Sequence, residues 1–329
     1  MLHLGHRYVA PFVWDYQHRG EPNHHRLDRA APGVGRFPPM GEPHVATTND
    51  EAIEAWDGVL FDRFVEYRHV LLEGLGVHGE VALRAFPPQP GERVVDIGCG
   101  FGDTAQQIAE MVGPEGEVLG IDAAPRFVET SREEAEAAGI QNLRFEVCDP
   151  EEGMDGEFDR AFSRFGTMFF ANPVAALRNI RGALVPGGRL CMVVWRSKPE
   201  NPWLHEAEQT VERFVTEPED SDEPTCGPGP FAMANADTTS GMLVSAGFED
   251  IALRRCDQPY RMGADMEEAI GVVTAIGPAA EVIRLAGDAA DELRPQIETA
   301  LRKDLSKFEG DDGAVVSSAS TWIVTAVAP

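Results

Sequence analysis

The feature that most constrains this chain of 329 residues is a set of three glycines at alternate positions, Gly98, Gly100 and Gly102, just after an apolar run. The run before Asp96 is short and continuous, as in a parallel strand that is covered on both faces. Because glycine lacks a Cβ, the backbone can turn sharply there and approach a ligand closely. Residues 104–112 then have helical spacing, and a helix N-terminus favours negative groups. We therefore predict a strand, a ligand-binding loop and a helix, in that order.

Acidic residues stand at the ends of three successive predicted strands. Asp96 ends the first, Asp122 ends the strand over residues 117–122, and Asp149 follows the strand over residues 142–148. Parallel strands bring such residues to one edge of a sheet, where ligands bind in open α/β folds. A carboxylate about twenty residues after the glycines can accept hydrogen bonds from both hydroxyls of a ribose. The pattern predicts a nucleotide-like ligand at this edge.

The same residues resemble the class I S-adenosylmethionine-dependent methyltransferases. The similar segments are Asp96 to Gly102 for the first motif, Gly120 to Asp122 for the ribose acid, Cys148-Asp149 for the acid beside adenine, Phe158 to Phe165 for the fourth strand and Leu184 to Leu190 for the turn before the fifth. The resemblance is close over residues 50–260, loose for the C-terminal strand and missing over residues 1–44. Within this family, the chain resembles the small-molecule enzymes of the ubiquinone and menaquinone type.

The resemblance implies a fold, a cofactor and a reaction. The fold would be a doubly wound, Rossmann-like, seven-stranded and mostly parallel sheet with an antiparallel C-terminal edge strand and a helical cap. The cofactor would be S-adenosyl-L-methionine, and a small-molecule acceptor would be methylated on O, N or C by in-line displacement, in which positioning supplies most of the rate. The residues expected at the cofactor are Asp96, Gly98, Gly100, Gly102, Asp122, Ala123, Asp149, Pro150 and Ser163.

A hydroxyl acceptor would lose its proton as the methyl group arrives, so a general base is expected in such a site. His205 in the segment after the fifth strand is the first candidate and His69 on the N-terminal helix is the second. Tyr260, after the sixth strand, is a candidate for orienting the acceptor. Each of the three is more often a structural or surface residue than a base.

Local composition predicts how the chain is divided. The methyltransferase core is expected in residues 45–196, 236–260 and 313–329, cap insertions in 197–235 and 261–312, and an irregular arm in 1–44. Helical spacing over residues 52–75 predicts one helix or two that break at Gly58, and in the resembling family such helices fold over the cofactor. Apolar residues 165–170 suit a hydrophobic or aromatic acceptor, although a buried strand-to-helix connection explains them equally well.

Charge and cysteine content limit the partners. The formal net charge of −27 disfavours nucleic acid, because phosphate contacts need basic residues, and the three lysines form no basic cluster for an anionic membrane. Five widely spaced cysteines without CxxC spacing are typical of a reducing compartment, so the cytoplasm is the expected location. His18, His24 and His25 lack a recognised metal-ligand spacing, and we expect no metal. The sequence leaves open whether the protein forms a homodimer.

Two alternative functions are a less favoured dehydrogenase and a binding protein without catalysis. A nicotinamide-dependent dehydrogenase needs a glycine where Asp103 stands, and none of the four tyrosines has a lysine four positions later. A non-catalytic protein that binds S-adenosylmethionine is compatible with the sequence. The fourth strand ends in Ser163-Arg164-Phe165 without an Asn-Pro-Pro-Tyr type tetrad, which weakens protein-glutamine and nucleobase acceptors.

Overall fold

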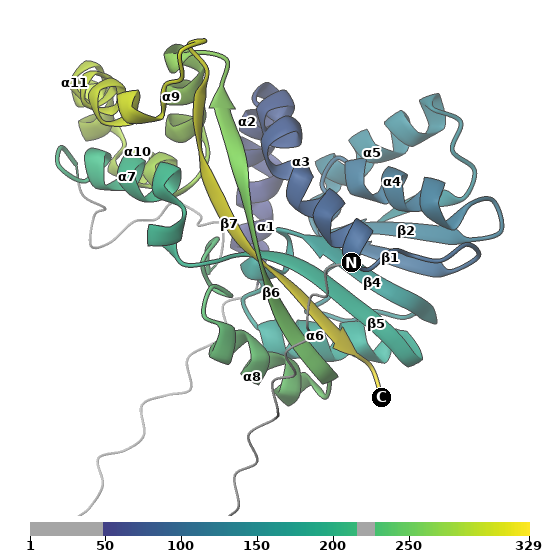
Figure 1. Ribbon diagram of the computed structural model, residues 1–329. Helices are drawn as coiled ribbons and strands as arrows, with labels where there is room; N and C mark the ends of the chain where they lie inside the picture. The colour runs from purple at the N-terminus through teal and green to yellow at the C-terminus, as the bar shows by residue number, and fades with distance from the viewer. Residues whose placement is uncertain (1–48, 216–227) are drawn as a thin grey trace, which may run out of the picture. The chain divides into compact units, whose positions relative to one another are not determined.

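The computed structural model describes residues 49–215 and 228–329 (Figure 1). The predictions for the arm over residues 1–44, the histidine cluster within it and the acidic run that begins at Thr216 therefore fall outside the described residues, except for the end of that run at residues 228–230.

One seven-stranded sheet with the order β3-β2-β1-β4-β5-β7-β6 organises the described chain. Its strands are β1 Arg93–Ile97, β2 Glu117–Asp122, β3 Leu143–Val147, β4 Phe158–Arg164, β5 Leu184–Trp195, β6 Glu249–Gly263 and β7 Val315–Val327. The first five strands pair in parallel, and β7 runs antiparallel to both β5 and β6. This topology confirms the predicted fold class.

Helices cover both faces of the sheet because successive strand residues point to opposite sides. In β1, Val94 packs in the cluster that includes α3 (Arg68–Ala85), α4 (Asp103–Val112) and α5 (Pro125–Ala137). Its neighbour Val95 packs in the cluster that includes α6 (Pro173–Gly182) and α8 (Ala236–Ala246). β1 is therefore buried on both faces. Because β1 pairs in parallel with β2 and β4, the carboxyl ends of these three strands lie at one edge of the sheet.

The N-terminal helical region is broken, as the glycine in it predicts. It consists of α1 (Asp50–Ala55), η1 (Trp56–Leu60) and α2 (Phe61–Glu66), followed by α3, which continues to Ala85. The break within η1 lies at Gly58, with φ −104° and ψ −113°. A second break at Tyr67, with φ −102° and ψ 16°, was not predicted.

A group of helices after β5 and β6 packs together. It comprises η3 (Lys198–Glu200), α7 (Pro202–Val211), α9 (Met266–Ala275), α10 (Pro278–Ala286), α11 (Asp288–Leu305) and η4 (Ser306–Phe308). Thr210 on α7 donates a hydrogen bond to Asp304 on α11 over 2.7 Å. β6 and β7 reach this group as a long two-stranded ribbon (Figure 1). We call these elements the helical group.

No single helix among the described residues is long and apolar enough to cross a membrane. The pair α9 and α10 passes by length and composition only, and it bends by 65° between the two helices.

Candidate functional site

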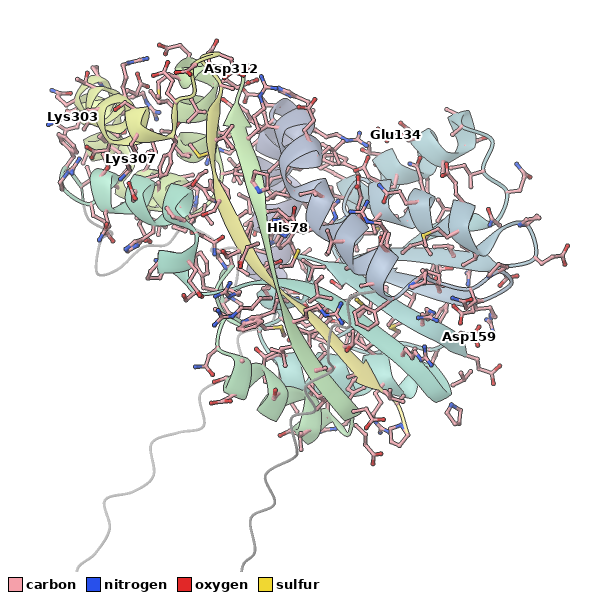
Figure 2. The ribbon with its side chains drawn as sticks, viewed as in Figure 1. His78, Glu134, Asp159, Lys303, Lys307 and Asp312 are labelled. Atoms are coloured by element: carbon pink, nitrogen blue, oxygen red, sulfur yellow. The ribbon has the colours of Figure 1, made fainter. Side chains whose placement is uncertain are left out.

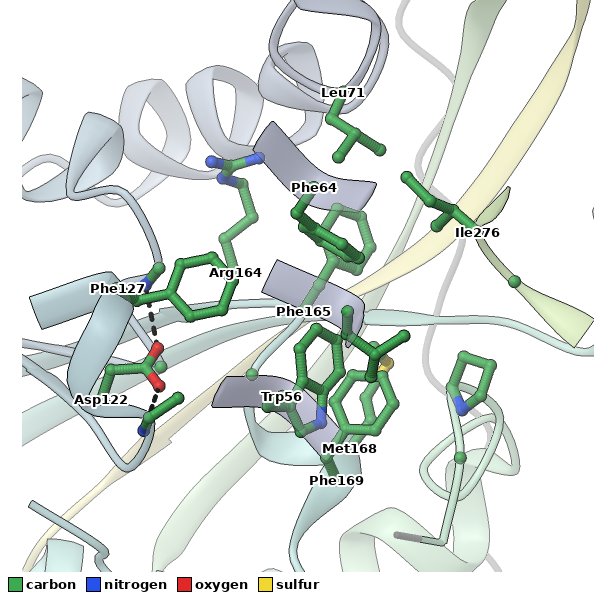
Figure 3. A pocket seen from close by; sticks show the side chains of 18 of the residues that line it. Trp56, Phe64, Leu71, Asp122, Phe127, Arg164, Phe165, Met168, Phe169 and Ile276 are labelled. Carbon is green, nitrogen blue, oxygen red and sulfur yellow. Dashed lines mark hydrogen bonds between the residues drawn. The ribbon is translucent and has the colours of Figure 1, made fainter. Parts of the chain in front are cut away.

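A cavity of about 750 Å³ opens at the carboxyl edge of the parallel strands (Figure 3). The glycine loop and the strand-end residues Asp96, Asp122 and Asp149 line one part of it. The rest includes residues of α1, η1, α2 and α3, the segment after β4, residues 228–231 and the helical group. The volume falls within the range of roughly 300–1,000 Å³ that is common for small-molecule sites.

The glycine loop depends on glycine for its backbone shape. Gly98, Gly100 and Gly102 have φ values of 65°, 54° and 78°, the left-handed region that other residues rarely adopt. A Cβ at Gly98 would lie 2.9 Å from the Cα of Gly166, so the loop and the segment after β4 could not remain this close. The loop therefore presents bare backbone to the cavity.

Asp122 holds this loop in place. Its Oδ2 accepts a hydrogen bond from the backbone N–H of Gly100 and its Oδ1 accepts one from that of Ala124, both over 3.0 Å (Figure 3). Burial raises the pKa of this carboxyl, and the backbone donors oppose that shift. A carboxylate has about four acceptor positions, so capacity remains for a hydroxyl group of a ligand.

Asp96 has a buried oxygen without a partner. Its side chain is 1% exposed, and its Oδ2 makes no hydrogen bond within the described part of the chain. Burial raises the pKa of Asp96 to about 7, although Arg164 opposes the shift. A buried acceptor without a donor costs free energy, so a cationic group of a ligand would be favoured beside it.

Arg164 lies beside the loop on the cavity wall (Figure 3). Its Nε donates to Thr104 Oγ1 over 3.0 Å, and burial lowers the pKa of its guanidinium. Thr104 belongs to the first turn of α4, so this bond ties the end of β4 to the helix after the glycine loop. The sequence showed Arg164 only as part of the fourth-strand motif and gave no signal for this contact.

Asp149 accepts hydrogen bonds from Asn49, just before α1, and from Glu151. Asn49 Nδ2 donates to Asp149 Oδ2 over 2.9 Å, and Asp149 Oδ1 accepts from the backbone N–H of Glu151 over 2.9 Å. Pro150 and Asn49 line the cavity together with Asp149. The N-terminal helical region is thus tied directly to the acid expected beside adenine.

Arg68 joins three elements at the cavity wall. It donates to Glu134 on α5 over 2.6 and 2.8 Å and to Asp103 on α4 over 2.9 Å. Its guanidinium carbon lies 4.4 Å from the ring centroid of Phe101, in the glycine loop. Sequence reasoning missed this residue, because its partners are 35 and 66 positions away in the chain.

Aromatic rings from several elements lie in the cavity wall. Trp56 lies 4.9 Å from Phe169, which belongs to the short helix η2 (Thr167–Phe169). Phe165 stacks on Trp195 at 4.5 Å, and Trp195 lies 6.1 Å from Trp203 on α7. All five rings line the cavity. Phe165 also has a φ of 63°, a strained backbone for a large side chain, and residues in such conformations cluster at functional sites.

Seven of the nine expected cofactor residues line this cavity: Asp96, Gly98, Gly100, Asp122, Ala123, Asp149 and Pro150. The other two lie behind it. Ser163 is fully buried and donates to the carbonyl oxygen of Ile97 over 2.8 Å, so it supports β1. Gly102 is the N-cap residue of α4, where a Cβ would lie 2.6 Å from the ring of Phe145.

The three candidates for a base or an orienting group do not line the cavity. His205 is half-buried on α7, and its Nδ1 has no partner among the described residues. His69 is 59% exposed and contacts Glu268 over 2.8 Å. Tyr260 is fully buried, with its ring 4.3 Å from that of Trp203, and burial raises its pKa. Their proposed roles stay predictions.

A further histidine, His78 on α3, is buried beside β6 and β7 (Figure 2). Its Nδ1 lies 3.0 Å from Thr321 Oγ1, and burial lowers its pKa to about 4. It is outside the residues that line the cavity, so we assign it a structural role. Residues 49–215 and 228–329 contain no group of three or more side chains arranged to hold a metal ion.

The fold and site define an open α/β protein that binds a nucleotide-like ligand at the carboxyl edge of its sheet. Comparison with known proteins gives the family. A family model described as "Methyltransferase domain" matches residues 88–236. The ubiquinone/menaquinone biosynthesis C-methyltransferase UbiE of Ectopseudomonas mendocina is 32% identical over 174 residues, which cover 50% of this chain and 67% of that protein. The chain therefore belongs to the class I S-adenosylmethionine-dependent methyltransferase family, which confirms the resemblance seen in the motifs.

Other similar proteins share shorter or more divergent stretches. Aklanonic acid methyltransferase DauC of Streptomyces sp. strain C5 is 40% identical over 105 residues, or 31% of this chain and 48% of that protein. The chain thus matches about half of the length of this relative. The crystal structure of YcgJ from Bacillus subtilis aligns over 77% of this chain and 98% of its own, with a TM-score of 0.49 and 17% identity.

Proposed function

We propose that this protein transfers a methyl group from S-adenosyl-L-methionine to a small-molecule acceptor. The observation that carries the proposal is one continuous cavity whose two ends differ. Strand-end carboxylates and bare glycine backbone form one end, and rings and apolar helix residues form the other. Such a cavity would hold a cofactor and an acceptor side by side, and positioning of this kind supplies most of the rate of a displacement.

The residues at the first end fit the cofactor. Asp122 has acceptor positions left for ribose hydroxyls, and Asp149 has positions left for the adenine amine. The unpartnered Oδ2 of Asp96 would receive the ammonium group of the methionine part. When bound, S-adenosylmethionine supplies a methyl carbon on a sulfonium that is open to in-line attack. The protein's own contribution is to orient the reactants and to exclude water.

We further propose that the two insertions, residues 197–235 and 261–312, form a cap that selects the acceptor. In support, α7 contributes Trp203 and Leu204 to the cavity wall, and the α9–α10 connection contributes residues 275–278. His205, the candidate for a general base from the sequence, lies on the same helix as Trp203 and Leu204 but does not line the cavity, so the effect of His205→Ala on turnover tests that role. A cytoplasmic location is supported by the four described cysteines, which are all unpaired.

Calorimetric titration with S-adenosylhomocysteine, the demethylated product, tests the proposal. We expect one site per chain and an affinity that S-adenosylmethionine matches closely. Inosine and NAD are the controls, since the first lacks the amine and the second would require the dehydrogenase fingerprint. An absence of heat with both adenosyl compounds, in a protein that unfolds cooperatively, would refute the cofactor assignment.

A further inference from the structure

We call the end of the cavity that rings and apolar helix residues line the acceptor end. Its wall is mostly apolar but contains an ion pair. Lys198 Nζ on η3 lies 2.7 Å from Oε1 and 2.6 Å from Oε2 of Glu208 on α7. The side chain of Glu208 is 13% exposed and that of Lys198 is 34% exposed. Both residues line the cavity. Removing two charged side chains from water costs solvation free energy, so a pair in this position need not stabilise the fold.

The surroundings of this pair are aromatic and aliphatic. Lys198 Nζ lies 5.7 Å from the ring centroid of Phe231. Leu204 and Trp203, on the same helix as Glu208, line the cavity beside it. Since aromatic walls favour the faces and edges of other rings, a flat ring is the ligand shape that this end fits best.

Other charged residues at this end are held differently. Arg63 donates to the carbonyl oxygen of Ala275 over 3.0 Å, which ties α2 to α9. Glu281 accepts from Arg284 over 2.8 Å, and Arg284 is not among the residues that line the cavity. Lys198 and Glu208 are a pair of opposite charges that both reach the cavity wall.

We propose that Lys198 and Glu208 bind the hydroxyl group of a planar aromatic acceptor. The ammonium group has three N–H donors and the carboxylate about four acceptor positions, so both keep capacity beyond their mutual contact. A hydroxyl group donates one hydrogen bond and accepts another, so it can use both partners. A carbonyl or ether oxygen could use only the lysine, and an amine cation only the glutamate. The inference rests on the proposed function, since it names the acceptor class for the same cavity.

The chain offers a matched control pair on the same helix. Glu206 on α7 contacts Lys307 in η4, which is labelled in Figure 2. Neither residue lines the cavity. The double variants Lys198→Met/Glu208→Leu and Lys307→Met/Glu206→Leu each remove one positive and one negative charge from α7 and its partner. They differ in whether the lost pair faces the cavity.

Calorimetric titration of 2-naphthol and naphthalene into the full chain saturated with S-adenosylhomocysteine tests the proposal. The wild-type protein should bind 2-naphthol at least about tenfold more tightly, as expected for hydrogen bonds to charged groups. Lys198→Met/Glu208→Leu should bind both compounds with affinities within about threefold of each other, by the same principle, while the control double variant keeps the wild-type preference.

Two results would overturn the inference: equal affinities in the wild-type protein, or a preference that survives in Lys198→Met/Glu208→Leu. Equal affinities in the wild-type protein would overturn it even if that variant fails to fold. The affinity for S-adenosylhomocysteine, measured on the same samples, separates the two proposals. If the wild-type protein does not bind S-adenosylhomocysteine, the result counts against the proposed cofactor. If it binds S-adenosylhomocysteine but has equal affinities for 2-naphthol and naphthalene, only the inference about the acceptor site fails.

Discussion

The two ends of the cavity are built in different ways. At the cofactor end, the loop from Gly98 to Gly102 is shaped by backbone dihedral angles and held by a carboxylate 22 positions away from Gly100. At the acceptor end, the wall comes from side chains on η3, α7 and the α9–α10 connection, such as Lys198, Leu204 and Ile276, which strand pairing does not place. The first end is fixed by local geometry, and the second can change side chain by side chain without disturbing the sheet.

Of the substitutions considered, Asp122→Ala at the cofactor end is expected to have the largest effect. It removes the acceptor for the backbone N–H groups of Gly100 in the glycine loop and of Ala124 after β2, and for the ribose hydroxyls. Affinity for S-adenosylhomocysteine should therefore fall about ten- to a hundredfold, at roughly 1.5–3 kcal/mol per charge-assisted bond. Calorimetry measures the change. Glu115→Ala, an exposed acid in the turn before the same strand, is the control. Equal affinities of the Asp122→Ala and wild-type proteins would remove Asp122 from the site.

This first end was largely predictable, for a physical reason. Left-handed backbone at Gly98 and Gly100 needs glycine, so the loop can be recognised in the sequence. The acids Asp96, Asp122 and Asp149 stand at the ends of recognisable strand patterns, within about fifty residues of one another. Ser163, expected at the cofactor, does not line the cavity, because its hydroxyl group donates to the carbonyl oxygen of Ile97 on β1. Such an orientation depends on packing and leaves no periodic mark in the sequence.

The second end was not predictable in the same way. Lys198 and Glu208 are ten positions apart on two different elements, and their partnership depends on the turn at Asn201 that separates η3 from α7. Arg68 likewise joins α3 to α4 and α5. Contacts of this kind arise from how elements pack, and a single sequence does not record them.

A smaller effect is expected from Gly98→Ala, and Gly139→Ala is its matched control. Both glycines have nearly the same φ, 65° and 68°, but a Cβ at Gly139 would meet nothing within 4 Å. Both variants should lose about 1–2 kcal/mol of unfolding free energy from the left-handed backbone. Gly98→Ala should in addition weaken cofactor affinity about tenfold, because its Cβ pushes against Gly166. Denaturant unfolding and calorimetry would show it, and equal cofactor affinity in both variants would contradict the close approach.

The pH dependence of stability should report on Asp96. Burial raises its pKa from 3.8 to about 7, so the folded protein binds this proton more tightly than the unfolded chain does. Its contribution therefore lowers the stability of the ligand-free protein as pH rises between those two values. Asp96→Asn should remove this slope in denaturant unfolding, whereas the exposed Asp155→Asn should retain it. Identical slopes in the wild-type protein and Asp96→Asn would show that the carboxyl is not buried as described.

The smallest effect is expected from His205→Ala. Because His205 does not line the cavity, its replacement should change turnover of a hydroxyl acceptor by less than about threefold, far below the roughly hundredfold typical for loss of a general base. Steady-state kinetics across pH are the measurement. A hundredfold loss, with one limb of the pH profile removed, would return His205 to the role that the sequence predicts.

Transfer of a radiolabelled methyl group tests the central claim most directly. The protein would be incubated with labelled S-adenosylmethionine and a panel of naphthols, hydroxyanthraquinones and aliphatic alcohols, beside Asp122→Ala as the control. We predict label in hydroxylated aromatic products, and a markedly lower yield with Asp122→Ala. Stoichiometric cofactor binding without label on any small molecule would contradict the account and would favour a protein that binds the cofactor without catalysis.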